Sequence, residues 1–390
     1  MKPFDRQNIA VIFGGRSAEH EISVITGLQA IQAIDSSYYQ ITPVYIAPNG
    51  KWYTGELLLN KSFYRRMTDS LHQIQEITLL PDPTIGGLVV KQSQKVIPVD
   101  VCFLATHGQF LEDGCLQGLL ELADLPYTGC GVTASAMAMD KYKCKAFFKT
   151  WGIPVLPSLA VSKQLAKENL HRIKELLSQI PELSQYPLFV KPNHLGSSIG
   201  VSVAKDDPSL FISLAKAFQY DDLALIEPYL ANMMEINVSV LDGDPPMVSV
   251  VEIPVSTDGK TLTYEDKYMR GGNKSKGRQR EGMASLTRMI NPPQLDPAIK
   301  QQALDFALKG FTALRCSGVV RFDFMFDKYS GILYFNELNP IPGSLAYYLW
   351  EKSEPPLLYT EVIQHLLERA LLRKAEQRSL KRDLGFKALI

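Results

Sequence analysis

The sequence has no excess of charge of either sign and no long apolar run. Its 390 residues contain 41 Lys plus Arg and 41 Asp plus Glu. This balance disfavours the strong global field of a protein that binds nucleic acid or a membrane surface. No stretch approaches the roughly 20 apolar residues of a membrane span, and polar residues precede the first apolar run. We therefore expect a cytoplasmic protein with small-molecule partners, no nucleic acid and no membrane.

Cysteine is also scarce. The five cysteines show no CxxC spacing, and their number is odd. This pattern disfavours both a structural zinc site and a disulfide scaffold. We expect reduced and mostly buried thiols.

The N-terminal region has the pattern of a doubly wound α/β domain. An apolar strand over residues 8–15 ends in two glycines and leads into a helical pattern over residues 21–33. Further strands are predicted over residues 41–46 and 99–105, whereas the polar segment 51–94 indicates an irregular surface insertion. Such domains bind ligands at the carboxyl ends of their strands.

Three polar side chains follow these elements. Glu19 lies in the turn after the first strand, His107 follows a later strand, and Lys141 opens a helix. A lone Glu19 is more often a helix N-terminal charge, and His107 is equally well explained as a buried structural histidine. Lys141 gains meaning only opposite a phosphate site. Lys143 and Lys145 are expected on a solvated helix face.

A second signal combines a lysine with a small-residue loop. Residues 188–192 predict a strand that delivers Lys191, and Gly196, Ser197 and Ser198 follow it. Glycine and serine let backbone N–H groups approach phosphate oxygens, to which the lysine adds a positive charge. This is not the GxxxxGK[ST] loop, because the lysine precedes the glycines. The combination supports a nucleotide lid as well as it supports a simple hairpin turn.

Two acids lie on the strands that follow. The strand over residues 224–229 ends at Glu227 and Pro228, and Glu235 opens the next strand. The proline leaves backbone groups available to an adenine edge, and Glu235 is suited to accept from ribose hydroxyls. An edge strand with exposed acids explains the same pattern.

Apolar runs on either side of an Asp-Lys-Tyr-Ser-Gly turn predict a β-hairpin. Alternation places Arg321 and Asp323 on one face of the first strand, and Phe335, Glu337 and Asn339 on one face of the second. Carboxylate and amide oxygens suit a hard cation such as Mg²⁺. For an isolated hairpin, a solvated face with an Arg–Asp pair is the simpler interpretation.

Two segments of the C-terminal half are rich in charge. Residues 263–288 are glycine-rich and basic, which is typical of a disordered loop or of a lid, and Tyr264, Lys267 and Tyr268 can reach a charged substrate. The absence of interleaved aromatic residues disfavours RNA binding. After the last predicted helix, the charged segment 373–387 is expected to be loosely held.

In their order along the chain, these motifs resemble a known family. Met-Asp-Lys, Phe-Val-Lys-Pro with GSSIGV, Glu-Pro-Tyr-Leu, Arg-Phe-Asp and Asn-Glu-Leu-Asn before a Pro-Gly resemble the ATP-grasp ligases. More narrowly, GGRSAEHEIS, THGQFLEDGCLQGLLE, PYTG and YEDKY look like the D-alanine:D-alanine ligases. The resemblance covers most of residues 8–372.

The resemblance implies an α/β fold that is α+β in its ATP-grasp part. An N-terminal substrate-binding domain with a doubly wound parallel sheet would span residues 1–150. A central ATP-grasp lid subdomain would span residues 151–243. A C-terminal catalytic domain, with a mainly antiparallel sheet and helices, would span residues 244–390.

The resemblance also implies a reaction. In this family ATP phosphorylates one D-alanine, and the amine of a second attacks the acylphosphate to give a dipeptide for peptidoglycan synthesis. It therefore implies ATP and two Mg²⁺ (or Mn²⁺) ions, D-alanine as substrate, and a homodimer.

Residue roles follow from the same resemblance. The metal ions would be held by Asp323, Glu337 and Asn339. The nucleotide would be held by Lys141, Lys191, Ser198, Glu227, Tyr229, Leu230, Glu235 and Lys267. The first substrate would meet Glu19, Ser197, Tyr268 and His107. Arg321 and the backbone N–H of Gly343 would stabilise the oxyanion, and Ser344 and Leu345 would receive the second carboxylate.

Two departures from the family pattern concern the second substrate. Asn339 is followed by Pro340, and Ser344 follows Gly343 directly, where typical members carry Asn-Thr-x-Pro-Gly and a longer run; the basic loop at 271–274 also differs. One alternative is therefore a related ligase with another acceptor, either D-lactate or an amino acid joined to a mycosporine-type core. An alternative of another class is a non-catalytic nucleotide-binding sensor, which the complete set of metal-ligand positions disfavours.

Overall fold

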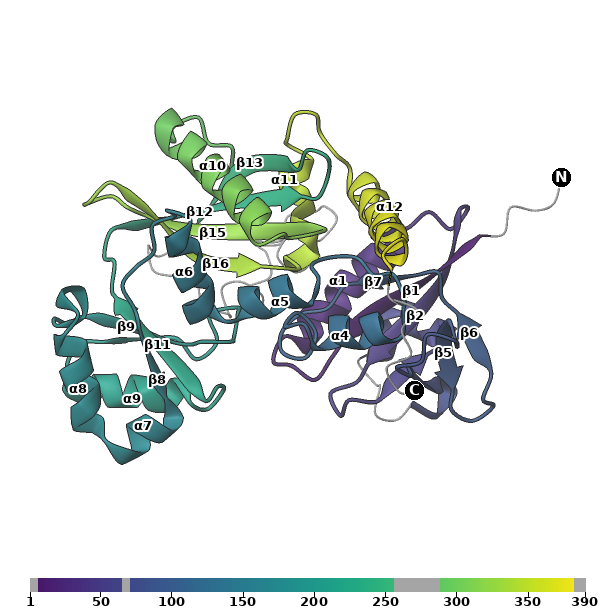
Figure 1. Cartoon of the computed structure of the whole chain (residues 1–390), viewed down its shortest axis with the longest axis horizontal. Helices are drawn as coiled ribbons and strands as arrows, with labels where there is room; N and C mark the ends of the chain where they lie inside the picture. The colour runs from purple at the N-terminus through teal and green to yellow at the C-terminus, as the bar shows by residue number, and fades with distance from the viewer. Residues whose placement is uncertain (1–5, 65–70, 256–287, 382–390) are drawn as a thin grey trace, which may run out of the picture.

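The computed structural model describes residues 6–64, 71–255 and 288–381. In this part of the chain three β-sheets form an elongated molecule (Figure 1), with the N-terminal sheet at the right, the C-terminal sheet in the upper middle and the central sheet at the left. A separate apolar core lies beside each sheet. This architecture confirms the α/β class with antiparallel sheets in the second part of the chain.

The N-terminal sheet is organised around β1 (Gln7–Gly14), in which Ile9 to Phe13 are fully buried. β1 pairs in parallel with β2 (Tyr39–Ile46) and β7 (Val101–Leu104). A strand covered on both faces reads as a continuous apolar run, as this one does. The helices that contribute to the same core include α1 (His20–Ala33), α4 (Cys115–Leu122) and α12 (Tyr359–Arg378).

The segment 51–94 is not the irregular insertion that its polarity predicts. Short antiparallel strands extend the sheet from β2, giving the order β6-β5-β4-β3-β2-β1-β7. The added elements are β3 (Trp52–Thr54), η1 (Glu56–Leu59), α2 (Lys61–Tyr64), η2 (Leu71–Gln73), β4 (Gln75–Thr78), β5 (Gly87–Val90) and β6 (Val96–Pro98). Strands of three or four residues are too short for alternation to stand out in the sequence.

The central sheet is antiparallel, in the order β10 (Ser202–Ala204), β9 (Leu188–Pro192), β11 (Leu223–Pro228) and β8 (Leu159–Ser162). Its covering elements are α7 (Lys163–Glu168), α8 (Leu170–Ser178), η3 (Pro181–Leu183) and α9 (Asp207–Ala217) (Figure 1). Leu188 and Val190 enter the core beneath these helices. Because strand side chains alternate, Phe189 and Lys191 face the opposite side, where the site lies.

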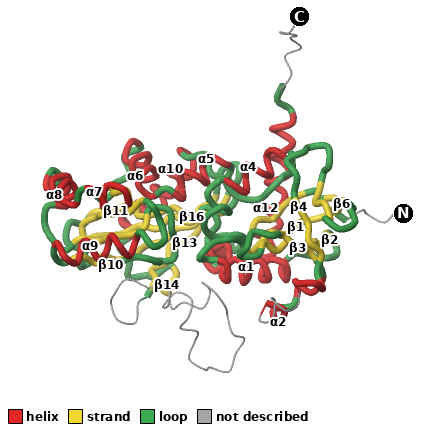
Figure 2. The backbone as a smooth tube through the Cα atoms, turned by 90° about the horizontal axis from the view of Figure 1, so that it is seen from below, coloured by secondary structure: helices red, strands yellow, loops and turns green. Residues whose placement is uncertain are grey.

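The C-terminal sheet is also antiparallel, in the order β14 (Arg288–Ile290), β13 (Met247–Pro254), β12 (Met233–Leu241), β15 (Val319–Asp327) and β16 (Ile332–Asn339). Its core includes side chains of α5 (Val132–Met139), α6 (Lys141–Thr150) and α10 (Pro297–Ala313). Seen from below (Figure 2), these three helices and α4 lie along one side of the molecule, and α1 lies along the other. Two short helices follow β16, namely η6 (Gly343–Ala346) and α11 (Tyr347–Trp350).

β12 belongs to the C-terminal sheet, although it precedes residue 243. It pairs along its whole length with β15.

The described end of the chain is firmly attached, contrary to the expectation for residues 373–387. Arg373 donates to the carbonyl oxygens of Tyr127 at 2.6 Å and Gly129 at 2.7 Å. Lys374 is 4% exposed and pairs with Asp124 at 2.7 Å. These partners are far away in sequence, so composition alone does not reveal them; residues 382–387 lie outside the described part.

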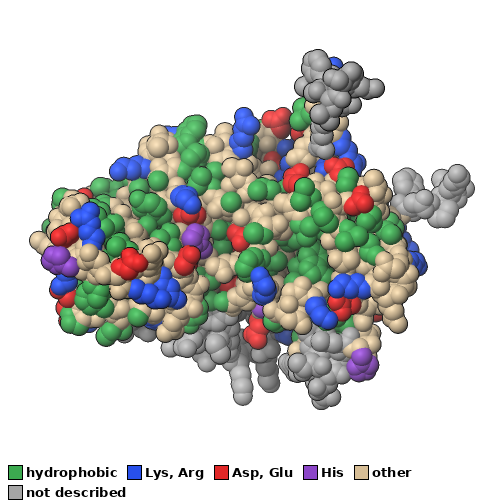
Figure 3. Space-filling model, turned by 60° about the horizontal axis from the view of Figure 1, so that its bottom comes forward, with side chains coloured by type: hydrophobic (Ala, Val, Ile, Leu, Met, Phe, Trp, Pro, Cys, Tyr) green, Lys and Arg blue, Asp and Glu red, His purple; other side chains and the backbone are tan. Residues whose placement is uncertain are grey.

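The expectation of reduced and mostly buried cysteines is confirmed. All five cysteines are free and four are buried. On the face in Figure 3, the described basic and acidic side chains are interspersed. Within the described ranges, no helix combines the length and apolar character needed to cross a membrane.

Candidate active site

The predicted hairpin forms, and its polar face is buried rather than solvated. Arg321 holds Asp323 through two hydrogen bonds, Nε to Oδ1 at 2.6 Å and Nη2 to Oδ2 at 2.7 Å. Asn339 Nδ2 donates to Asp323 Oδ2 at 3.0 Å. Burial raises the pKa of Asp323 to about 6, against the lowering effect of the guanidinium. The simpler interpretation, a solvated face, is therefore wrong.

A β-bulge in β16 decides which side chains reach this face. Asp323 opposes Glu337, whereas Phe324 opposes Phe335, so Asn336 is the extra residue. Strict alternation predicts Phe335 beside Glu337, and that prediction is wrong because Phe335 is fully buried in the C-terminal core. Asn336 lines the cavity beside Glu337 instead. Sequence periodicity cannot register one inserted residue, although the polar Asn336–Glu337 pair was visible within the motif.

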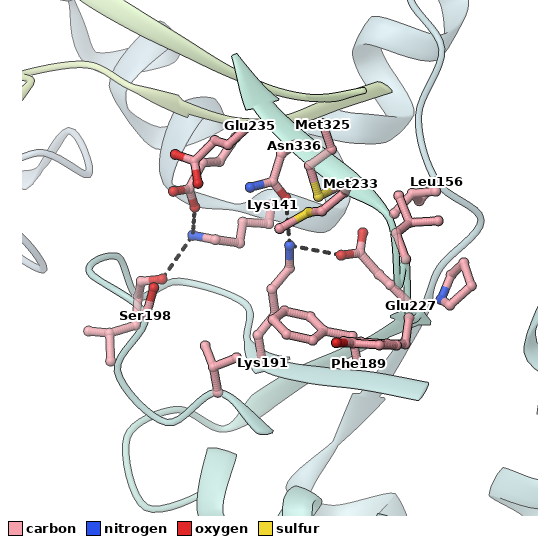
Figure 4. Close-up of a pocket in the computed structure, with 16 residues that line it drawn as sticks. Lys141, Leu156, Phe189, Lys191, Ser198, Glu227, Met233, Glu235, Met325 and Asn336 are labelled. Atoms are coloured by element: carbon pink, nitrogen blue, oxygen red, sulfur yellow. Dashed lines mark hydrogen bonds and ion pairs between the residues drawn. The ribbon is translucent and has the colours of Figure 1, made fainter. Parts of the chain in front are cut away.

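A cavity lies between the central and C-terminal sheets (Figure 4). Part of its wall is apolar, formed by Leu156, Phe189, Met233 and Met325. The residues predicted for the nucleotide that the structure describes all line it: Lys141, Lys191, Ser198, Glu227, Tyr229, Leu230 and Glu235. The side chains that the motifs assign to one nucleotide site therefore lie in one cavity of the folded protein.

Glu227 lies between two lysines at one side of this cavity. Lys191 Nζ is 2.8 Å from Glu227 Oε2 and 3.0 Å from Asn336 Oδ1. Lys145 pairs with Glu227 Oε1. Burial acts to raise the pKa of Glu227, but the two ammonium groups lower it below its ordinary value. The carboxylate is therefore held in its charged form.

Lys145 was predicted on a solvated helix face, and that prediction is wrong. Its side chain is 2% exposed, whereas the side chain of Lys143 is 72% exposed, as expected. Burial is the main cause that lowers the pKa of Lys145 to about 8. Spacing was the missed signal: Lys145 follows Lys141 by four residues and so shares its helix face, whereas Lys143 does not.

Lys141 is held from two directions. Its Nζ donates to the backbone oxygen of Leu195 at 2.8 Å and lies 3.1 Å from Glu337 Oε2 (Figure 4). Asp140 caps the same helix by accepting from the backbone N–H of Lys143 at 3.0 Å. Lys141 thus connects the Gly-Ser loop to the hairpin.

A second cavity adjoins the first. It is lined by Glu19, His107, Glu112, Gly196, Ser197, Arg321, Asn339, Pro340, Gly343 and others. Lys141 and Glu337 line both cavities. The predicted substrate and oxyanion residues of the N-terminal and C-terminal regions therefore meet beside the predicted nucleotide site.

Glu19 and Glu112 are buried acids among the described residues that line the second cavity. Ser197 Oγ donates to Glu19 Oε1, and Ser197 has a left-handed φ of 55°. A Cβ at Gly196 would lie 3.2 Å from the same carboxylate, so the loop approaches closely because this residue is glycine. Burial, followed by the charge of Glu112, raises the pKa of Glu19. A nearby ammonium would favour its ionised form.

His107 is both held and accessible to the cavity. Its Nε2 lies 3.0 Å from Thr26 Oγ1, and its Nδ1 lies 3.8 Å from Glu112 Oε1. It is 5% exposed and still lines the second cavity. The structural histidine and the substrate-facing histidine are thus not exclusive alternatives.

Comparisons with known proteins agree with this geometry. Residues 8–130 match the family model of the D-ala D-ala ligase N-terminus, and residues 147–368 match that of the D-ala D-ala ligase C-terminus. The chain belongs to the D-alanine–D-alanine ligase family. It is 33% identical over 363 residues to the D-alanine–D-alanine ligase of Thermosipho africanus, covering 93% of each chain. It is 34% identical over 387 residues to that of Chloroherpeton thalassium, covering 97% of this chain and 100% of the relative.

Solved structures of D-alanine–D-alanine ligases and a related ligase share the fold. The D-alanine–D-alanine ligase from Coxiella burnetii has a TM-score of 0.77 at 27% identity and covers 96% of both chains. The VanG D-Ala:D-Ser ligase from Enterococcus faecalis has a TM-score of 0.75 at 26% identity, covering 94% of this chain and all of that one. The family predicted from the motifs is confirmed.

Some residues assigned through the D-alanine–D-alanine ligase family are not among the described residues that line the two cavities. Lys267 and Tyr268 fall outside the described residues. Ser344 and Leu345 are 1% and 2% exposed, and neither is among the residues that line the two cavities described above. The Leu345 side chain packs in the N-terminal core, and its N–H donates to Pro342 O at 2.8 Å. Gly343 is the residue of this turn that lines the second cavity.

The donor set fits the nucleotide and divalent metal used by D-alanine–D-alanine ligases. Two carboxylates and an amide, from Asp323, Glu337 and Asn339, are oxygen ligands of the kind Mg²⁺ prefers. A cation nearby would offset the burial that raises the pKa of Asp323. The apolar wall suits a base, while Lys141 and Lys191 suit phosphates.

Proposed function

We propose that the protein is an ATP-dependent ligase that joins two D-alanine molecules for peptidoglycan precursor synthesis. The observation that carries the proposal is that Lys141 and Glu337 line both cavities. A phosphoryl group that passes from ATP to a substrate carboxylate must cross one such boundary. Phosphoryl transfer depends chiefly on alignment and charge neutralisation, which one cation and one carboxylate at the boundary suit.

In the nucleotide cavity, Lys141 and Lys191 would bind phosphate oxygens, with Ser198 and the loop backbone beside them. Glu227, Tyr229 and Leu230 would border the adenine, and Glu235 would accept from the ribose. Lys267 would approach the transferred phosphoryl group. These roles are supported by the fact that the described residues line one cavity. The role of Lys267 rests on the family resemblance alone.

Asp323, Glu337 and Asn339 would hold two Mg²⁺ or Mn²⁺ ions. When bound, such ions neutralise charge on the phosphates and align them. Arg321 fixes the Asp323 carboxylate through two hydrogen bonds, which would keep that ligand oriented.

In the second cavity, Glu19 would pair with the ammonium of the first D-alanine, linked through Ser197 to Tyr268. His107 would lie beside the reacting carboxylate. A carboxylate oxygen of that substrate takes the γ-phosphoryl group and ADP leaves. The amine of the second D-alanine then attacks the carbonyl carbon, a C–N bond forms, the C–O bond to the phosphoryl group breaks and inorganic phosphate leaves. Arg321 and the Gly343 N–H would stabilise the oxyanion between these events.

A second candidate keeps the acylphosphate and changes the acceptor. Pro340 and Gly343 line the cavity where the acceptor would bind, and Ser344 follows Gly343 directly. One structural relative is itself described as a D-Ala:D-Ser ligase. D-Serine and D-lactate therefore belong in the test, together with an amino acid acceptor core of the mycosporine type.

The proposal includes three wider features that the resemblance implies. The three sheets would be the cores of three domains, with the second boundary moved to between β11 and β12. The protein would act in the cytoplasm and as a homodimer. Sedimentation velocity at several concentrations would report the oligomeric state.

The decisive experiment measures ATP-dependent phosphate release by the purified full chain with D-alanine alone and with D-alanine plus each other acceptor, with product identification by mass spectrometry. We expect release with D-alanine alone and formation of its dipeptide. Lys141→Met should abolish the activity, and Lys143→Met, its exposed neighbour, should preserve it. ATP binding without turnover for any acceptor would instead identify a sensor, and turnover only with another acceptor would identify a related ligase.

A further inference from the structure

The turn after β16 is tied to helix α1 of the N-terminal sheet. Ser344 Oγ donates a hydrogen bond to Gln29 Oε1 at 2.9 Å. We propose that Gln29 is a positioning residue for the second substrate and acts through Ser344 on the turn Gly343–Ala346. This inference rests on the proposed function, in which the turn borders the acceptor.

The backbone of the turn needs such support. Ser344, Leu345 and Ala346 have φ values of 51°, 54° and 51°, so three successive residues other than glycine are left-handed. A Cβ atom makes the left-handed backbone conformation unfavourable. The conformation therefore persists only where contacts with the surrounding structure hold the backbone in place. The Leu345 side chain anchors one side of the turn in the N-terminal core. The bond from Ser344 to Gln29 anchors the other.

Helix α1 relates the two substrate positions to each other. Glu19 is its N-cap residue and lines the second cavity, as does Gly343. Gln29 lies ten residues further along, which corresponds to about 15 Å of helix. One rigid helix therefore carries the acid proposed for the first substrate and the anchor of the turn proposed for the second. A loosened anchor should displace the acceptor without disturbing Glu19.

The chemistry of an amide suits this role. Gln29 Oε1 accepts the single proton of the Ser344 hydroxyl, which fixes the side chain of Ser344 and with it the backbone of the turn. A carboxylate at position 29 also accepts this proton. Gln29→Glu should therefore keep the anchor, whereas an apolar side chain at position 29 removes it.

The test separates activation of the first D-alanine from use of the second. Hydroxylamine replaces the acceptor amine, so ATP-dependent formation of D-alanine hydroxamate reports activation alone. For Gln29→Leu we expect hydroxamate formation within about twofold of the unmodified protein and a KM for the second D-alanine raised about tenfold or more. Gln29→Glu should keep that KM within about twofold, because its carboxylate still accepts from Ser344 Oγ. Gln32→Leu changes an exposed glutamine on the same helix and should change neither readout.

Three results would contradict the inference. The first is a KM for the second D-alanine that stays within about twofold of the unmodified protein in Gln29→Leu. The second is an equal loss of hydroxamate and dipeptide formation in Gln29→Leu, and the third is that the effects of Gln29→Leu and Ser344→Ala add in a double-mutant cycle. If thermal unfolding shows that Gln29→Leu does not fold, Gln29→Met carries the same test, because its unbranched side chain has a similar length and no amide oxygen. Failure of the proposed function has a different signature, because the unmodified protein would then form neither dipeptide nor hydroxamate from D-alanine.

Discussion

Lys145 and Glu227 form an ion pair in which each side chain is only 2% exposed. The same carboxylate also pairs with Lys191, which lines the nucleotide cavity. Two cations thus share one anion inside the protein, and the pair orients Lys191 while Lys145 compensates the buried charge. Removing one partner of a buried ion pair destabilises the protein by more than the intact pair stabilises it, because the remaining charge stays buried without a partner.

Replacing Lys145 by Met should lower the free energy of unfolding by about 3 kcal/mol, near the lower end for a broken buried pair because Lys191 remains. Urea unfolding followed by circular dichroism measures this change. Lys143→Met is the matched control, since its side chain is 72% exposed, and it should stay within about 0.5 kcal/mol of the unmodified protein. Equal effects of the two substitutions would contradict the assigned burial.

His194 connects the loop before Gly196 to helix α6. Its Nδ1 lies 3.0 Å from Asp221 Oδ1, and its Nε2 lies 3.5 Å from Asp140 Oδ2. The hydrogen bonds to Asp140 and Asp221 raise the pKa of His194 to about 9, against the effect of burial. Both carboxyl groups have lowered pKa values, so they stay charged near neutral pH. Asp140 also pairs with Lys143 at 2.8 Å.

This raised pKa predicts a pH dependence of stability. A histidine whose pKa in the folded protein exceeds its ordinary value of about 6.5 stabilises the folded state. This stabilisation is fully present below pH 6.5 and is lost as the pH rises through about 9. His194→Gln should therefore be less stable than the unmodified protein at pH 6, and the difference should narrow toward pH 10. Urea unfolding across this range measures it. His171→Gln, at a side chain that is 82% exposed, is the control; a gap for His194→Gln that does not change with pH would refute the assignment.

The sequence predicts those parts of the site in which a function needs particular residue types next to a particular local backbone conformation. The strand before Lys191, the Gly-Ser loop and the Arg321–Asp323 spacing are local, and each was visible in a few adjacent letters. The structure places Lys191, Gly196, Ser197, Ser198 and Arg321 in the lining of two adjoining cavities. The roles that the family resemblance implies for them stay predictions.

The features of the site that the sequence does not predict depend on one inserted residue or on partners that are far away in the sequence. One extra residue in β16 turned Phe335 into the core and Asn336 into the cavity. Lys145 on helix α6 is buried because its partner Glu227 lies on β11, far away in the sequence. Arg373 on helix α12 donates to the carbonyl oxygens of Tyr127 and Gly129, which are also far away in the sequence. For both cations, tertiary contacts override a polar composition that would otherwise indicate solvent.

Glu337→Gln should affect turnover more than nucleotide binding. The substitution keeps the shape of the side chain but removes the charge at the boundary of the two cavities, where Lys141 Nζ lies 3.1 Å away. We expect kcat to fall at least about 100-fold, while the Kd for ATP without metal changes by less than about tenfold. Single-turnover kinetics and isothermal titration measure the two quantities. A kcat within a few-fold of the unmodified protein would make the metal assignment wrong.

Arg321 has two possible roles that a pair of substitutions can separate. If it stabilises the oxyanion directly, Arg321→Met should raise the barrier by about 2.7–4 kcal/mol, a loss of roughly 10²–10³ in kcat. If it acts only by orienting Asp323, the loss should recover as Mg²⁺ is raised, because excess metal compensates a weaker ligand. Arg321→Lys retains the charge but cannot form the bidentate fork seen at 2.6 and 2.7 Å. We expect the loss in Arg321→Met to persist at saturating Mg²⁺ and Arg321→Lys to recover only part of the rate. Full recovery of Arg321→Met by metal would move Arg321 from the oxyanion to the support of Asp323.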